Sequence, residues 1–325
     1  MKIATSAFDL IGNTPMIRLS QVANGLRASI LAKCEFMNPT GSIKDRMVKE
    51  MLEDAEKTGE IKPGSTILIE ATSGNTGISL AALGSVKGYD VVLVMTDDTN
   101  QEIQDLVGHF GAKVVLTPVE GLTTTDLQIE GRVIYREKAA RMVRNRITAE
   151  MLEADPAKYM LDQSTNLANV RAHWQTGREI LEQTDGKVDA VVLGVGTGGT
   201  IMGISQVLRE AAPDVLIVAV EPAEATSNSS DEPTIYGIQG ISDGVVPEIV
   251  DLREIDEIIR VSSTEAWRMA SRLAREEGFP VGPSSGANVS AALQVAERFG
   301  TDQNIVTLLP DRASRYLSFG LFKEL

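Results

Sequence analysis

One lysine of this chain stands where a side-chain amine can become a nucleophile. The sequence NPTG at 38–41 predicts a turn, and a helical pattern begins near Ser42, so Lys44 lies in the first helical turn. The helix dipole disfavours a positive charge at that position and lowers the pKa of an amine. An unprotonated amine can form a Schiff base. The structural alternative is a surface lysine that pairs with Asp45 or Glu50.

Two glycine-containing turns stand at the start of expected helices, where helix N-termini can bind anions. The first, TSGNTG at 72–77, follows an expected strand, and its hydroxyls and free backbone N–H groups suit a carboxylate or a phosphate. Its residue types are also good helix caps, so a capped helix without a ligand is the alternative. The other, GPSSGA at 282–287, precedes an Ala-rich helix and by itself predicts only a capped helix start.

A third turn, GVGTGGT at 194–200, follows the strand with the strongest signal. Its glycines match the dinucleotide fingerprint G-x-G-x-x-G, and Glu221 stands near the spacing expected of the acid that binds the ribose. This pattern leaves a nicotinamide-dependent dehydrogenase as an alternative function. The hydroxyls of Thr197 and Thr200 instead favour a terminal phosphate, which takes more donors than a bridging pyrophosphate.

These turns are placed by an alternation of strands and helices. The expected strands lie at 66–70, 90–95, 113–117, 188–195, 215–221 and 304–309. Their nearly continuous Val, Ile and Leu runs are typical of parallel strands buried on both faces, with helices as crossovers. The 325 residues suffice for about two domains. We therefore predict an α/β fold with two doubly wound domains and mostly parallel sheets.

Composition excludes several function classes. Lys and Arg number 31 and Asp and Glu 45, so the net charge is −14, which disfavours nucleic-acid binding. A single cysteine, Cys34, and two histidines predict neither a disulfide nor a metal site. No apolar run approaches the roughly 18 residues of a membrane span, and the N-terminus lacks the apolar region of a secretory signal. We expect a soluble, cytoplasmic enzyme.

Together these features match what pyridoxal phosphate requires: a lysine whose amine has a lowered pKa, a glycine-rich turn that suits a phosphate, and two further helix starts. With these motifs the chain resembles the cysteine synthase / cystathionine β-synthase family of fold-type II pyridoxal-phosphate enzymes, whose fold is similar to that of tryptophan synthase β. The resemblance runs over most of the length. The sequences IGNTP at 11–15 and RYLS at 315–318 are also similar to family signatures.

The resemblance implies a role for each matching residue. Lys44 would form the internal aldimine and later move the Cα proton, Asn75 would contact the 3′ oxygen of the cofactor, and Ser284 its pyridine nitrogen. The phosphate would be held by Gly196, Thr197, Gly198, Gly199 and Thr200. The substrate α-carboxylate would be bound by Thr72, Ser73, Asn75, Thr76 and Gln163. Gly240 would face the substrate amine.

The implied reaction is a β-replacement that makes L-cysteine from an activated serine, O-acetylserine or O-phosphoserine, and sulfide, through an aminoacrylate intermediate. A serine hydroxyl at the pyridine nitrogen leaves that nitrogen neutral and favours loss of a β substituent over transamination. A cystathionine β-synthase-like enzyme or another β-substituted alanine synthase is the alternative within the class. Outside it stand a dehydrogenase and a diverged homologue that binds the cofactor without turnover.

Departures from the family pattern lie around substrate entry, after 99 and after 118, and leave the cofactor residues intact. The basic stretch at 132–146 is either a solvated helix face or the lining of the site's mouth. In the second case it would favour an anionic donor such as O-phosphoserine.

The resemblance also implies an organisation into two domains. Residues 1–12 and 36–158 would form a smaller, mobile domain that grips the substrate, and residues 13–35 and 159–325 a larger one with the phosphate loop. Family members are usually homodimers, and some bind the tail of serine acetyltransferase in the active site. We expect no metal, nucleic acid or membrane partner.

Overall fold

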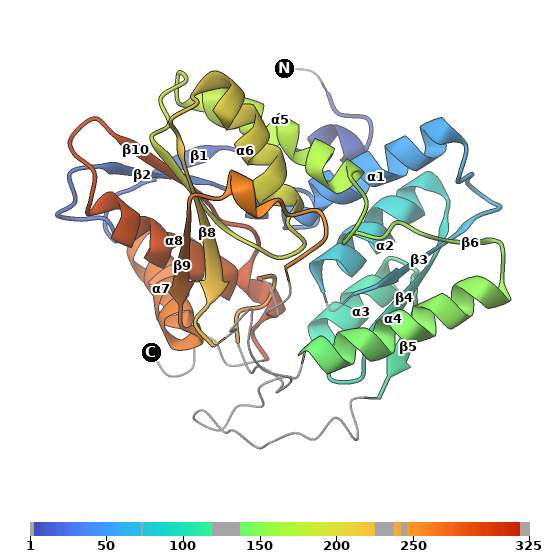
Figure 1. Cartoon of the computed structure of the whole chain (residues 1–325). Helices are drawn as coiled ribbons and strands as arrows, with labels where there is room; N and C mark the ends of the chain where they lie inside the picture. The colour runs from blue at the N-terminus through green and yellow to red at the C-terminus, as the bar shows by residue number, and fades with distance from the viewer. Residues whose placement is uncertain (1–2, 73, 119–136, 225–236, 242–245, 319–325) are drawn as a thin grey trace.

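The computed structural model describes residues 3–72, 74–118, 137–224, 237–241 and 246–318. In this part of the chain, two separate sheets carry helices on both faces (Figure 1). The helices are α1 (Lys44–Thr58), α2 (Asn75–Lys87), α3 (Gln101–His109), α4 (Glu137–Ala154), α5 (Ala168–Gln183), α6 (Gly199–Ala211), α7 (Ser263–Glu276) and α8 (Pro283–Ala296). The strands are β1 (Met16–Leu19), β2 (Ser29–Lys33), β3 (Ile67–Ala71), β4 (Asp90–Thr96), β5 (Lys113–Thr117), β6 (Lys158–Met160), β7 (Ala190–Gly194), β8 (Leu216–Pro222), β9 (Glu257–Val261) and β10 (Asn304–Leu308).

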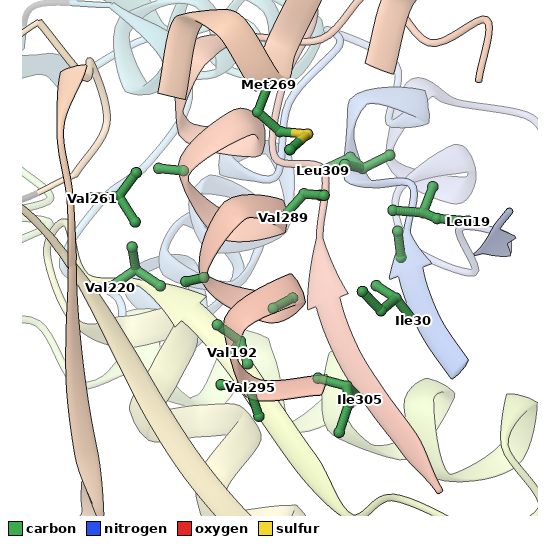
Figure 2. Packing of buried hydrophobic residues seen from close by; sticks show 14 of the residues in the cluster. Leu19, Ile30, Val192, Val220, Val261, Met269, Val289, Val295, Ile305 and Leu309 are labelled. Carbon is green, nitrogen blue, oxygen red and sulfur yellow. The ribbon is translucent and has the colours of Figure 1, made fainter. Parts of the chain in front are cut away.

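The larger sheet has the strand order β1-β2-β10-β7-β8-β9, and every pair except β1 with β2 is parallel. Val192 and Val220 belong to the core on the side of α7 and α8, where Figure 2 shows them near Val295 of α8. Neighbouring residues such as Val191 belong to the core on the side of α6. Both faces are therefore buried, which explains the continuous apolar runs.

The smaller sheet has the order β5-β4-β3-β6 and is parallel throughout. Leu68 and Leu93 pack in one core with α1, α2 and α3, whereas Ile69 and Val94 pack in another with α4. Figure 1 shows α4 on one face of this sheet. The predicted α/β class with two mostly parallel sheets is confirmed. None of the described helices has the length and apolar character of a membrane span.

The division into two domains at the predicted boundaries stays a prediction. Strands β1 and β2 lie in the larger sheet, and β6 pairs with β3 in the smaller one. The predicted boundary between 158 and 159 thus falls inside β6, the strand that precedes α5. Phe8 near the N-terminus packs into the core that α1 and α2 share.

Four charged side chains form a buried network where β2, α1 and α5 meet. Lys33 Nζ lies 2.8 Å from Glu179 Oε2, and Arg46 forms ion pairs of 2.7 Å with both Glu35 and Glu179. All four residues are less than 5% exposed. Burial opposes the ionisation of Glu179, yet hydrogen bonds from Arg46 and Lys33 lower its pKa to about 2. Two cations and two anions balance, which makes the burial tolerable.

Replacement of Glu179 by alanine leaves one buried cation without a counter-charge. We expect Glu179→Ala to lower the free energy of unfolding by about 3–5 kcal/mol at neutral pH, as measured by urea denaturation. The matched control is Glu276→Ala, which removes the half-exposed partner of Arg272 on α7 and should cost less than about 1 kcal/mol. Equal losses in the two variants would contradict the role given to the network.

Candidate functional site

Three helices begin beside a single pocket at the carboxyl ends of strands. Helix α1 begins at Lys44 and α2 at Asn75, while α8 begins one residue before Ser284. The pocket is lined, among others, by Lys44, Asn75, Gly194, Gly196, Thr197, Gly198, Thr200, Gly240 and Ser284. Residues up to 240 positions apart in sequence thus meet in one place, as open α/β sheets allow where their loops converge.

Lys44 is the first residue of α1, as the sequence predicts. Burial lowers the pKa of its amine from the ordinary 10.5 to about 8, and the charge of Asp311 acts in the opposite direction. The alternative of a surface lysine paired with Asp45 or Glu50 is not what the structure shows. Asp45 accepts hydrogen bonds from Thr40 and Ser79, and Glu50 lies 3.8 Å from Arg171. Lys44 therefore faces the pocket with an amine that is easily deprotonated.

The turn at 194–200 needs its glycines. Gly198 has a φ of +92°, and it precedes α6 as the N-cap. A Cβ on Gly196 would lie 2.5 Å from the carbonyl oxygen of Gly240, and one on Gly199 would collide with the side chain of Asn169. The turn is thus packed closely against its neighbours. Its backbone N–H groups stand at the positive end of a helix, which favours an anion.

Two residues that sequence reasoning did not assign to the site hold the threonines of this turn. Asn169 Nδ2 donates a 2.9 Å hydrogen bond to Thr197 Oγ1, and His173 Nε2 lies 3.2 Å from Thr200 Oγ1. Burial, followed by the nearby charges of Arg46 and Lys44, lowers the pKa of His173 well below 6.5 and keeps the ring neutral. His173 is buried in α5 and fixes a threonine that lines the pocket.

Two of the residues expected to bind the substrate carboxylate, Thr76 and Gln163, are in direct contact, and of the described members of the set only Asn75 is among the residues that line the pocket. Thr76 Oγ1 donates a 2.6 Å hydrogen bond to Gln163 Oε1, and Thr72 Oγ1 accepts one of 3.2 Å from the Gly74 N–H. Ser73 lies outside the described residues. Glu70, at the end of β3, accepts backbone hydrogen bonds from Asp162 and Gln163 and so holds the loop that carries Gln163. Burial raises the pKa of Glu70 to about 8.

Asn75, Ser284 and Gly240 complete the pocket wall. Asn75 Nδ2 donates a 2.6 Å hydrogen bond to Asp311 Oδ2, while its Oδ1 is buried and has no partner among the described residues. Ser284 is 5% exposed in the first turn of α8. Gly240 has a φ of +88°, a conformation that favours glycine. An unpartnered buried oxygen in the wall of a pocket marks a place where a ligand can bind.

The basic stretch is described only in part. Residues 132–136 lie outside the described residues. Arg146 is exposed and lies 3.8 Å from Glu150 one turn further along α4, which agrees with a solvated helix face. Arg144, in contrast, is 5% exposed. Whether the stretch reaches the mouth of the site stays a prediction.

Comparison with known proteins identifies the family of this chain. The family model "Pyridoxal-phosphate dependent enzyme" matches residues 7–311. Cysteine synthase 3 of Caenorhabditis elegans is 41% identical over 97% of this chain and 89% of that protein. Cystathionine beta-synthase of Apis mellifera is 38% identical over 98% of this chain, which spans only 61% of that longer protein. The crystal structure of cysteine synthase from Entamoeba histolytica superposes with a TM-score of 0.90 at 34% identity, covering 100% of this chain and 92% of that one.

These matches exclude the dehydrogenase alternative that the glycine pattern left open. Glu221, the residue at the ribose-binding spacing, lies instead 3.7 Å from Arg260 on the next strand. The cofactor of this fold family is pyridoxal phosphate, and the pocket contains an amine, a glycine turn at a helix start and an unpartnered oxygen. The chain belongs to the pyridoxal-phosphate dependent enzymes and, within them, is a cysteine synthase-like enzyme of β-replacement.

Proposed function

We propose that this enzyme makes L-cysteine from an activated serine, O-acetylserine or O-phosphoserine, and sulfide. The observation that carries the proposal is the convergence of Lys44, Asn75, Ser284 and the turn at 194–200 on one pocket. Support for the substrates comes from the relatives, of which two are named cysteine synthase. The similarity to a cystathionine beta-synthase keeps serine and homocysteine as the second pair of substrates to be tested.

The residues of the pocket fit pyridoxal phosphate, which supplies an electron sink for the negative charge that develops on the substrate Cα. We assign the phosphate to the turn formed by Gly196, Thr197, Gly198, Gly199 and Thr200. Backbone N–H groups and the α6 dipole favour its negative charge, and Asn169 and His173 hold the two hydroxyls in place.

Lys44 is the proposed point of covalent attachment and, once the substrate has displaced it, the base for the Cα proton. Both roles need an unprotonated Nζ, and burial provides one near neutral pH. Ser284 offers an uncharged hydroxyl for the pyridine nitrogen, which leaves that nitrogen neutral. Asn75, at the start of α2, is the residue that would hydrogen-bond the 3′ oxygen of the cofactor.

The proposed carboxylate site consists of Thr72, Ser73, Asn75, Thr76 and Gln163. The start of α2 brings a positive helix end to it, and the hydrogen bond between Thr76 and Gln163 joins the two segments that form it. Gly240 would face the substrate amine. A homodimer, a serine acetyltransferase partner and a cytoplasmic location stay predictions that rest on the resemblance alone.

The first test concerns Lys44. With pyridoxal phosphate added to cofactor-free protein, the rate of borohydride-stable attachment should rise with pH, reach half of its maximum near pH 8 and level off only above about pH 9, because half of this amine is unprotonated at its pKa. Lys44→Ala should abolish attachment and turnover, whereas Lys57→Ala, an exposed residue at the end of the same helix, should change neither. Peptide mass spectrometry that finds the label on another lysine would refute the assignment.

The second test concerns the phosphate turn. Gly196→Ala places a methyl group 2.5 Å from the Gly240 carbonyl oxygen, so the turn has to shift. We expect at least about a hundredfold weaker binding of pyridoxal phosphate, or about 2.7 kcal/mol, in an absorbance titration. Gly108→Ala in α3 meets open space and serves as the control. Unchanged affinity in the Gly196 variant would place the phosphate elsewhere.

The third test concerns the substrates. With sulfide as nucleophile, kcat/KM for O-acetylserine or O-phosphoserine should exceed that for serine at least about tenfold, because hydroxide is a poor leaving group. A second series replaces sulfide by homocysteine. If kcat/KM for serine with homocysteine exceeds kcat/KM for the activated serines with sulfide, the cysteine synthase proposal is rejected in favour of the cystathionine type. A clear preference for the acetyl ester would reject the role of the basic stretch in binding a phosphoryl donor.

A further inference from the structure

Asp311 is a buried carboxylate beside the pocket to which none of the roles above applies. It follows β10 and Pro310, which lines the pocket, and it is only 1% exposed. Its Oδ2 accepts hydrogen bonds from Asn75 Nδ2 at 2.6 Å and from the hydroxyl of Tyr316. Its Oδ1 has no partner among the described residues. A carboxylate is costly to bury, so its place here needs an explanation.

The same residue contacts the segments that lead into three helices. Its backbone forms an isolated antiparallel bridge with Ser42, two residues before α1. Its carbonyl oxygen accepts a 3.1 Å hydrogen bond from the N–H of Gly282, the N-cap of α8, and its side chain binds Asn75, the first residue of α2. A Cβ on Gly282 would collide with Oδ1. Asp311 therefore lies where α1, α2 and α8 begin, and their positive ends favour its charge.

The hydrogen bond to Asn75 sets the orientation of the amide. A carboxylate only accepts hydrogen bonds, so the amide nitrogen of Asn75 must face Asp311 and the oxygen must turn away. The oxygen is the buried, unpartnered atom in the pocket wall. If an amide side chain replaced Asp311, it could pair with either the nitrogen or the oxygen of the Asn75 amide. The orientation of Asn75 would then no longer be fixed.

The charged and titratable groups around Asp311 are Lys44, Arg315 and Tyr316. Burial raises the pKa of Asp311, while these three groups and Asn75 lower it. Arg315 acts on Asp311 through its charge, and it donates hydrogen bonds to the backbone carbonyls of Thr40 and Gly41, in the turn before α1. The charge of Asp311 also raises the pKa of the Lys44 amine, against the larger effect of burial.

We propose that Asp311 is a positioning residue of this site. From the place where three helices begin, it orients the Asn75 amide by a hydrogen bond. Its negative charge, held by the bridge to Ser42 two residues before Lys44, stabilises the protonated form of the Lys44 amine. Asp311 contacts neither cofactor nor substrate and acts through Asn75 and Lys44. The inference rests on the proposed roles of Lys44 and Asn75.

The test uses Asp311→Asn, which removes the charge and keeps the size. In the full chain freed of cofactor, Lys44 is labelled with acetic anhydride over a range of pH, and the label is quantified by mass spectrometry. Without the carboxylate, the apparent pKa of Lys44 should fall by about one unit or more. In the same variant, the Kd for pyridoxal phosphate should rise about tenfold, because Asn75 is no longer oriented.

The matched control is Asp189→Asn. Asp189 accepts a 2.7 Å hydrogen bond from the Asn304 N–H at the opposite end of β10, so its loss perturbs the same strand far from the pocket. This variant should leave both the Lys44 profile and the cofactor affinity unchanged. An unchanged Lys44 profile in Asp311→Asn would overturn the proposal, as would an equal shift in the control.

If Asp311→Asn does not fold, Asp311→Ser replaces it, since the smaller neutral side chain cannot crowd Gly282. Failure of both variants to fold, while the control folds, would assign Asp311 a structural role only and would overturn the proposal. The Lys44 profile is measured without cofactor. If pyridoxal phosphate proves to be attached elsewhere, the proposed function fails even though the labelling experiment still reports on the pair of Asp311 and Lys44.

Discussion

Arg46 lies two residues beyond Lys44 on α1, and its guanidinium pairs with Glu35 and Glu179 away from water. Glu179 in turn pairs with Lys33 at the end of β2. Helix α1 packs with the smaller sheet and β2 belongs to the larger one, so this network fixes the start of α1 relative to both. Removal of one member would leave a charge that the interior cannot solvate, which gives the arrangement little freedom to relax.

On this base the pocket is assembled from segment ends rather than from any single motif. Each of α1, α2, α6 and α8 directs its positive N-terminus toward the pocket, and the polar residues that line it, Asn288 in the second turn of α8 excepted, come from the first turns of these helices or from the turns before them. An anionic cofactor and an anionic substrate can both be bound by backbone groups there. The side chains at the start of the helices then decide chemistry, with an amine on one, an amide on another and a hydroxyl on a third.

Six of the ten described strands, the class of fold and the position of Lys44 at a helix start could be predicted because they depend on local patterns of apolar residues and turns. The strands expected from apolar runs do not include β1, β2, β6 and β9. The contacts of Asn169 with Thr197 and of Asp311 with Asn75 could not, since they join residues 28 and 236 positions apart. No periodic pattern in the sequence predicts a contact between residues so far apart. His173 shows the same limit, since its contact with Thr200 depends on how α5 packs beside α6.

The raised pKa of Glu70 sets the charge beneath the loop that carries Gln163. At pH 7 this group is mostly protonated, because its pKa of about 8 lies above the ambient pH. The loop that carries Gln163 therefore rests on an uncharged acid of the underlying strand rather than on an anion. The negative charge beneath this loop appears only as the solution becomes alkaline, so at neutral pH the loop needs no additional cation to offset it.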